Sequence, residues 1–335
     1  MEDRSNKLKK HVITKEQDKL LREYDERLRS NNVVIIYNLR HLRKVLQIEK
    51  KEQDIFFGKC KKENYRTFYI PKKSGGFRKI EAPKNRLLEC QKWIKKNILD
   101  SVNISQYAKG FKKGSSIIEN AKPHTNKEVV INLDLNNFFG TVKYNQVFSF
   151  FVYIGYTHEV AHLLTKLCTN DVNVLPQGAP TSPSLSNIIC LKLDKRLANL
   201  AATFHADYTR YADDITFSGD RSILKMVPLI KKIIQEEKLF INYKKFRISF
   251  AYQKQEVTGL TVNKKLGVSK ELINEIEKAI YFCQKLGVDN HMKNINCDRT
   301  YYKEHLYGIA YFVKMIDRDK GDKYINELNK INWIY

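Results

Sequence analysis

Two adjacent aspartates, Asp213 and Asp214, constrain the fold of this chain more than any other feature of its sequence. Residues 204–210 and 215–218 are predicted strands, so the pair lies at the tip of a hairpin. Like charges in contact repel each other, and the pKa of one carboxyl rises unless cations neutralise the pair. Because side chains alternate along a strand, both carboxylates can face one way only across a tight turn. Taken alone, such a pair is more often a solvated turn than a site, so its surroundings decide.

A third carboxylate ends a second apolar segment. Residues 129–134 form a short apolar run that finishes at Asp134, and this pattern predicts a buried strand that carries the carboxylate at its C-terminal end. If the strand lies beside the hairpin, three carboxylates line one pocket, and hard oxygen ligands suit Mg²⁺. Two Mg²⁺ ions about 4 Å apart can activate a ribose hydroxyl and stabilise a leaving pyrophosphate. The pattern is therefore typical of phosphoryl transfer.

The charge balance favours a polyanionic partner. The chain has 335 residues, with 60 Lys and Arg against 37 Asp and Glu, and its net charge of +23 attracts phosphates. A solvated, lysine-rich surface would give the same excess, so charge alone does not decide. We find no apolar run long enough to span a membrane, no signal peptide and no CxxC pair among six scattered cysteines. These absences favour a cytoplasmic protein without a membrane partner, a zinc site or disulfides.

Apolar spacing and turn residues predict the remaining elements. A hairpin over residues 65–83 turns at Gly75-Gly76, and an amphipathic helix follows over residues 85–100. Other predicted elements are a helical N-terminal extension, helices over 143–154, 157–169 and 222–237, a loop over 175–180 followed by a helix to about 202, short strands up to residue 260, and a basic helical region from Ser269.

Five segments together resemble the motifs of reverse transcriptases, in the order of that family, across roughly residues 60–260. The resemblance rests on Val130-Ile-Asn-Leu-Asp-Leu-Asn-Asn-Phe-Phe139, Leu175-Pro-Gln-Gly-Ala-Pro-Thr-Ser-Pro183, Tyr211-Ala-Asp-Asp214, Leu239-Phe-Ile-Asn-Tyr-Lys-Lys245 and Val257-Thr-Gly-Leu260. Asn120-Ala-Lys-Pro-His124 and Val257-Thr-Gly259 also resemble two short elements of the bacterial retron reverse transcriptases. Each short element is weak by itself, and their joint presence identifies the retron group.

The resemblance implies an α+β fold of the right-hand polymerase type, with fingers, a palm built on an antiparallel sheet, and a helical thumb. The expected domains are an N-terminal helical extension over residues 1–40, fingers and palm over 41–260, and a basic helical thumb over 261–335.

The resemblance also assigns roles at the reacting centre. Asp134, Asp213 and Asp214 are expected to hold two Mg²⁺ ions, with the carbonyl of Leu135 as a further ligand. Lys245, or its neighbour Lys244, is expected to protonate the leaving pyrophosphate.

Further roles concern the nucleotide and the RNA. Phe139 is expected to exclude the 2′-OH of ribonucleotides, while Gln177 and Gly178 line the incoming deoxynucleotide. Arg78, with Lys72 or Lys73, would bind its triphosphate. The residues expected to take part in RNA recognition are Asn120, His124, Val257, Thr258 and Gly259.

As a retron enzyme, the chain would copy a structured non-coding RNA into single-stranded DNA that stays branched from a 2′-OH of that RNA. Its expected partners are the RNA, the DNA product, deoxynucleoside triphosphates and an accessory effector protein in anti-phage defence. Three alternatives stay open: an abortive-infection type of reverse transcriptase, a relative of the group II intron enzymes, and a non-catalytic RNA-binding relative of polymerases.

Overall fold

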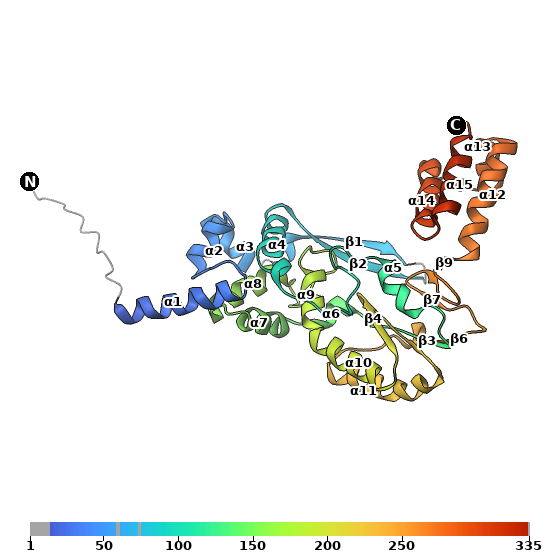
Figure 1. Ribbon diagram of the computed structural model, residues 1–335. Coiled ribbons are helices and arrows are strands. Elements are labelled where there is room, and N and C mark those ends of the chain that lie inside the picture. The colour runs from blue at the N-terminus through green and yellow to red at the C-terminus, as the bar shows by residue number, and fades with distance from the viewer. Residues whose placement is uncertain (1–13, 58–60, 73–74, 334–335) are drawn as a thin grey trace, which may run out of the picture. The chain divides into compact units, whose positions relative to one another are not determined.

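The computed structural model describes residues 14–57, 61–72 and 75–333, and the chain forms two compact units (Figure 1). The first unit combines Met1–Ser105 with Asn137–Leu191, and the second combines Gln106–Asn136 with Lys192–Tyr335. Helices and antiparallel sheets occur in both units, which confirms the predicted α+β class. The division into an extension, fingers with palm, and thumb at residues 40 and 260 stays a prediction.

Helix α1 (Lys15–Ser30) confirms a helix in the N-terminal extension, whose first 13 residues lie outside the described part. The Thr14 side chain accepts a hydrogen bond from the Gln17 N–H and begins the helix. Of the four apolar residues at helical spacing in this helix, Tyr24 and Leu28 are buried, whereas Leu20 and Leu21 are exposed. The Tyr24 hydroxyl donates to the carbonyl of Ile36 at 2.6 Å, so this helix belongs to the core of the first unit.

The first unit is a helical core with one two-stranded hairpin. Strands β1 (Tyr65–Pro71) and β2 (Phe77–Pro83) pair antiparallel, as predicted. Its helices are α1, α2 (Leu39–Val45), α3 (Gln53–Phe57), α4 (Asn85–Asn97), α6 (Phe138–Thr141), α7 (Tyr144–Tyr153), α8 (His158–Cys168) and α9 (Ser182–Ile189). One continuous apolar cluster joins most of them, including residues of α4, α7 and α8.

The second unit is built on a four-stranded antiparallel sheet in the order β4-β5-β3-β6. Its strands are β3 (Val129–Asp134), β4 (Asp207–Tyr211), β5 (Asp214–Gly219) and β6 (Arg247–Phe250). Strand β4 begins three residues later than predicted. The chain turns there first, because His205 has a positive φ of 51° and the Ala206 N–H bonds back to the carbonyl of Ala201.

Alternation along these strands gives the sheet two different faces. Ile131 and Leu133 of β3 and Ile215 and Phe217 of β5 point to one face and are buried. The opposite face is more polar: beside the buried Val130 it carries Asn132, Asp134, Thr209, Asp214 and Thr216, among others. The polar face therefore carries the carboxylates that the sequence places in one site.

Helices and short strands complete the second unit. These elements are α5 (Ile117–Ala121), α10 (Leu191–Thr203), α11 (Val227–Glu236), β7 (Glu256–Val257), β8 (Leu260–Thr261), β9 (Gly267–Val268), α12 (Lys270–Leu286), α13 (Val288–Asn294), α14 (Tyr302–Lys314) and α15 (Arg318–Asn329). Helices α12 to α15, orange to red in Figure 1, gather around an apolar cluster of their own. This confirms the helical region predicted from Ser269, whose side chain caps α12. Among the described residues, no helix is long and apolar enough to cross a membrane.

Candidate active site

The catalytic hairpin is a tight turn between β4 and β5. Tyr211 and Asp214 face each other as the last pair, so only Ala212 and Asp213 form the turn. Ala212 has a φ of 59°, a left-handed conformation that an alanine rarely adopts. The guanidinium of Arg210 donates from Nη1 to the Ala212 carbonyl at 3.0 Å and holds the turn in this shape. The predicted hairpin with its Asp pair at the tip is therefore confirmed.

Arg210 is itself held by a buried ion pair. Its Nε and Nη2 atoms each donate to a carboxylate oxygen of Asp194 in α10 at 2.7 Å, and both side chains are fully buried. The Tyr208 hydroxyl donates to the same carboxylate at 2.8 Å. A two-bond pair of this kind fixes the guanidinium in one plane. The conformation of the hairpin therefore depends on the carboxylate of Asp194, which holds Arg210 on the buried face of the sheet.

Gly110 lies directly against the turn. A Cβ atom at this position would come within 2.5 Å of the backbone nitrogen of Ala212. The residues before Gly110 form backbone hydrogen bonds with β4. The Lys109 N–H donates to the Arg210 carbonyl at 2.7 Å, and the Arg210 N–H donates to the Tyr107 carbonyl at 2.9 Å. Only glycine allows this close approach, so the segment braces the hairpin from outside the sheet.

Asp134 stands opposite Asp214 in the register of β3 and β5, which brings the first carboxylate to the tip of the hairpin. The side chain is 7% exposed and accepts hydrogen bonds from two side chains. Asn242 donates from Nδ2 to Oδ1 at 3.0 Å, and the ammonium of Lys245 donates to Oδ2 at 2.6 Å. The structure thus brings together Asp134, Asp214 and Lys245, as the sequence predicted.

Leu135 follows Asp134 and lies beside the other aspartate. Its N–H donates to the backbone carbonyl of Asp213 at 3.0 Å. The N–H and C=O of one residue in a strand point to the same edge, so the Leu135 carbonyl faces the hairpin. Its use as a metal ligand stays a prediction, and its position beside the three carboxylates is compatible with that use.

The site holds an excess of negative charge. Partial loss of hydration, together with the charges of Asp213 and Asp134, raises the pKa of Asp214 to about 7, while the ammonium of Lys245 acts against the rise. The hydrogen bond to Asp134 and the surrounding carboxylates raise the pKa of Lys245. A raised carboxyl pKa beside a bound ammonium marks a place where a cation is stabilised.

Divalent metal ions fit this donor set. The aspartates and the Leu135 carbonyl offer the hard oxygen atoms that Mg²⁺ prefers. Lys245 is a cation already bound to Asp134. Within residues 14–57, 61–72 and 75–333, no group of three or more His, Cys, Asp or Glu side chains is close enough to form a finished metal site. The carboxylates are gathered here in an arrangement stabilised by Lys245.

The predicted nucleotide-binding residues belong to the first compact unit. Phe139 lies in α6 and is half-buried, with its ring 5.5 Å from the buried ring of Phe138. The Gln177 carbonyl accepts from the Glu81 N–H of β2 at 2.8 Å. Gly178 has a φ of 132°, and a Cβ there would meet Ile80 at 2.9 Å, so glycine is required.

The predicted triphosphate-binding residues lie on the hairpin of the first unit. Arg78 is an exposed residue of β2 and pairs with Ile70 of β1. Lys72 is exposed at the turn, where its N–H donates to the Gly76 carbonyl at 2.9 Å. Lys73 lies outside the described residues. The contacts of Lys72 and Arg78 with a nucleotide stay predictions.

The two retron-like elements contact each other. Thr258 and Gly259 form the two-residue turn between β7 and β8, with φ values of 47° and 82°. A positive φ is strained for a β-branched residue. Asn120 donates from Nδ2 to the Thr258 hydroxyl at 3.3 Å, and that hydroxyl donates to the Ile117 carbonyl at 3.4 Å. Val257 is buried against Ala121 in the same apolar cluster.

His124 is fully buried against the sheet. Its Nδ1 lies 2.7 Å from the Ser218 hydroxyl, and its Nε2 lies 2.8 Å from the Thr209 hydroxyl. The Thr209 hydroxyl donates to the Asn120 carbonyl at 3.4 Å, so it accepts from Nε2–H and Ser218 donates to Nδ1. Roles of Asn120 and His124 in RNA recognition stay predictions, and burial restricts both side chains to positioning other groups.

Sequence reasoning did not single out three residues that shape the site: Arg210, Gly110 and Asn242. Arg210 carries the clearest signal, because a charged residue in a strand expected to be buried must find a buried partner. Gly110 and Asn242 carry no such signal, because their contacts come from segments far away in the chain.

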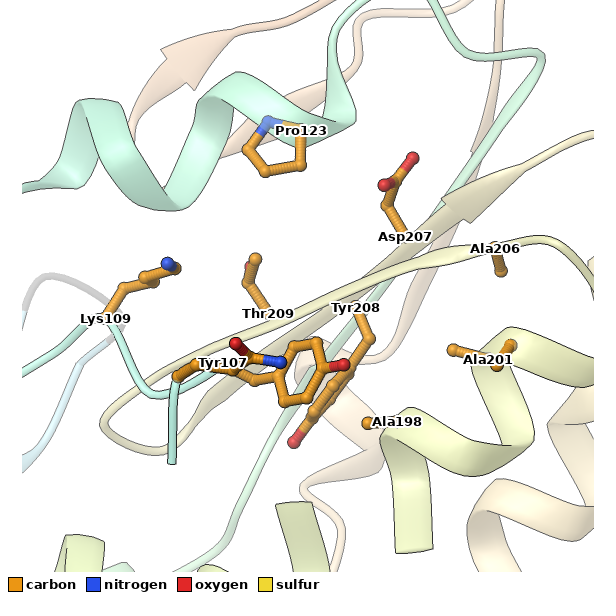
Figure 2. Close-up of a pocket in the computed structure, with 11 residues that line it drawn as sticks. Tyr107, Lys109, Pro123, Ala198, Ala201, Ala206, Asp207, Tyr208 and Thr209 are labelled. Atoms are coloured by element: carbon orange, nitrogen blue, oxygen red, sulfur yellow. The ribbon is translucent and has the colours of Figure 1, made fainter. Parts of the chain in front are cut away.

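A cavity of about 370 Å³ lies beside β4 and α10 (Figure 2). Small side chains of α10, including Ala198 and Ala201, leave the space, and Lys109, Asp207 and Thr209 reach its rim. The cavity contains none of the predicted site residues, and we assign it no part in the chemistry.

The chain is similar to several known proteins. A family model described as reverse transcriptase (RNA-dependent DNA polymerase) matches residues 70–263. The chain is 33% identical over 314 residues to the retron Ec86 reverse transcriptase of Escherichia coli, covering 92% of this chain and 94% of that protein. It is 35% identical over 279 residues to the retron Mx65 reverse transcriptase of Myxococcus xanthus, covering 78% and 63%. A solved foamy viral protease-reverse transcriptase in complex with double-stranded DNA has a TM-score of 0.45 and 15% identity, covering 80% of this chain and 44% of that chain.

Burial of His124 predicts a pH-dependent stability. Burial lowers the pKa of this imidazole to about 4, with Asp207 acting in the opposite direction, whereas an unfolded histidine titrates near its usual value of about 6.5. Between these values the unfolded chain binds more protons, so stability rises with pH, and His124 contributes about 3 kcal/mol of this dependence. With respect to His124, the folded state therefore has its full stability above about pH 6.5. As the pH falls from 6.5 towards 4, protonation of His124 in the unfolded chain lowers the free energy of unfolding.

The measurement is denaturant unfolding at pH 5 and at pH 7.5. His124→Gln keeps a donor and an acceptor but does not titrate, so its stability should depend less on pH than that of the wild type. The account of His124 is wrong if both proteins lose the same stability between the two pH values.

Proposed function

The chain belongs to the reverse transcriptases of the retron type and is an RNA-directed DNA polymerase, and from this premise we propose that it copies a structured non-coding RNA into single-stranded DNA that stays branched from that RNA. The observation that carries the proposal is the register of β3 and β5, which sets Asp134 opposite Asp214 in a chain similar to retron enzymes over 92% of its length.

Two Mg²⁺ ions are proposed as cofactors. Asp134, Asp213 and Asp214, with the Leu135 carbonyl, would hold them. When bound, the ions supply activation of the attacking hydroxyl and stabilisation of the charge on the leaving pyrophosphate. The protein contributes the fixed orientation of the ligands, because β3 and the braced hairpin both carry them on a rigid sheet.

Lys245 has two proposed roles in succession. In the described arrangement its ammonium neutralises Asp134. Because this side chain is 51% exposed, its ammonium would be free to leave Asp134, to turn towards the leaving pyrophosphate and to donate a proton from Nζ. The neighbouring Lys244 is also exposed, but in the described part of the chain its side chain forms no ion pair with an aspartate of the site. We therefore assign the proton transfer to Lys245.

Residues of the first compact unit supply selection of the nucleotide in this proposal. Phe139 would meet the 2′ position of the sugar, Gln177 and Gly178 would line the base and sugar, and Lys72 and Arg78 would bind the triphosphate. Gly178 supports the proposal because the close approach of Ile80 leaves no room for a side chain there.

The remaining proposed partners are the template RNA, the DNA product and an accessory effector protein, in an anti-phage system working in the cytoplasm. The net charge of +23 supports binding to a long polyanion. The joint presence of Asn120, His124 and the Val257–Gly259 turn supports the retron assignment over the abortive-infection and group II intron alternatives.

The direct test is primer extension on an RNA template with Mg²⁺, together with sequencing of the nucleic acid that copurifies from cells. We expect wild-type protein to extend the primer and Asp213→Asn to give no product, because one of the proposed metal ligands is lost. We also expect a templated DNA branched from RNA. Untemplated DNA of random sequence would favour the abortive-infection alternative, and extension by neither protein would favour an RNA-binding relative.

Lys245 and Lys244 form a matched pair for testing the proton donor. We expect Lys245→Met to lower the single-turnover rate of nucleotide addition by roughly a hundredfold, the usual scale for loss of a general acid. Lys244→Met removes the same charge from the chain and is therefore the matched control. Its rate should stay close to wild type, because the proposal gives the Lys244 side chain no part in the reaction. Equal effects of the two substitutions would remove Lys245 from the mechanism.

Phe139 is tested by its effect on sugar selection. Replacing the ring by the smaller side chain in Phe139→Val should raise kcat/KM for ribonucleotides relative to deoxynucleotides by about tenfold or more, the scale of a steric difference of this size. Addition of deoxynucleotides serves as the internal control. Unchanged sugar selectivity would show that another residue excludes ribonucleotides.

A further inference from the structure

We propose that Asn242 is a positioning residue for the metal site, because its side-chain amide fixes the orientation of the Asp134 carboxylate. The inference rests on the proposed two-metal chemistry and adds to it a residue that is not among the proposed metal ligands or nucleotide-binding residues. Asn242 lies in the segment before the 3₁₀ turn at Tyr243–Lys245, in the same compact unit as all three aspartates.

The first observation is a short antiparallel pairing next to the sheet. The Asn242 N–H donates to the Asp134 carbonyl at 2.8 Å, and the Asn136 N–H donates to the Phe240 carbonyl at 2.7 Å. Leu135 and Ile241 face each other between these bonds. Opposite residues in such a pair direct their side chains to one face, so Asn242 and Asp134 share the polar face of the sheet.

The second observation is that the amide of Asn242 has only one satisfactory orientation. Its Nδ2 donates to Oδ1 of Asp134 at 3.0 Å, and its Oδ1 accepts from the Lys244 N–H at 3.3 Å. Exchange of the amide nitrogen and oxygen would set a carbonyl against a carboxylate and an NH₂ against an N–H. The hydrogen-bond network therefore determines which end of the amide meets Asp134.

The two donors to Asp134 differ in how freely they can leave. Lys245 has a long side chain that is 51% exposed, so its ammonium can leave Oδ2 without movement of the backbone. Asn242 is bonded to Asp134 through both its backbone and its side chain. We therefore expect Asn242 to stay on Oδ1 while Oδ2 changes partners, so that the carboxylate keeps its orientation. Partners of this kind commonly contribute ten- to hundredfold to metal affinity.

Asn242 could instead matter only as the cap of the 3₁₀ turn, and substitution separates the two roles. In Asn242→Ser the hydroxyl can still accept from the Lys244 N–H, but it is too short to donate to Asp134. Asn242→Ala loses both bonds. Asn132→Ser is a matched control, because Asn132 lies on the same strand and face as Asp134 and donates to Thr216 at 3.3 Å.

The experiment measures Mn²⁺ binding to the full chain by electron paramagnetic resonance, without primer or nucleotide, and Asp134→Asn identifies the signal that belongs to this site. We expect Asn242→Ser and Asn242→Ala each to raise the Kd for Mn²⁺ by roughly ten- to hundredfold, and Asn132→Ser to stay within about twofold of wild type. Wild-type affinity in Asn242→Ser, or an equal loss in Asn132→Ser, would overturn the proposal.

This readout is independent of the polymerase reaction. A wild-type protein that binds Mn²⁺ at the aspartates but extends no primer would count against the proposed function, while the comparison among the variants would still decide the role of Asn242.

Discussion

The repulsion among three carboxylates at one end of a sheet is the interaction on which the rest of this structure depends. The register of β3 and β5 sets Asp134 against Asp214, with Asp213 in the adjoining turn. A folded chain can keep such charges together only if it supplies compensating cations and donors. Lys245 and Asn242 supply them to Asp134, while burial, together with the charges of Asp213 and Asp134, raises the pKa of Asp214.

The opposite side of the sheet holds the hairpin in shape. The buried pair of Arg210 and Asp194 is costly to desolvate, and such pairs add little to stability by themselves. Here the guanidinium also binds the carbonyl of Ala212, in a turn whose φ is unfavourable for alanine. We infer that the pair serves the geometry of the Asp213–Asp214 turn. Gly110 serves the same end by allowing a backbone segment to lie against the turn.

Much of this arrangement could be predicted from the sequence, because it follows from local patterns. The apolar run before Asp134 and the two segments around Asp213 and Asp214 have the composition of buried strands, and the structure has strands there. In the same way, the glycines Gly75 and Gly76 predicted the hairpin of β1 and β2, and the helical spacing in residues 85–100 predicted α4. Motif order then placed the carboxylates in one site.

Other features could not be predicted, because they depend on contacts between distant segments. The grouping of residues 137–191 with the N-terminal part, and of 106–136 with the C-terminal part, has no local signal. The same holds for the bond between Asn242 and Asp134. For His124 the motif gave the residue but not its burial, which depends on hydroxyl groups of β4 and β5. The start of β4 was predicted too early because the chain turns at His205, where φ is positive, before the strand begins.

The most direct test of the two-metal account is the anomalous diffraction of crystals of this protein soaked in Mn²⁺. The account predicts two peaks about 4 Å apart, bounded by Asp134, Asp213 and Asp214, with the ammonium of Lys245 moved away from Asp134 and the amide of Asn242 still bonded to it. A site that binds no Mn²⁺ while Lys245 stays on Asp134 would contradict the account.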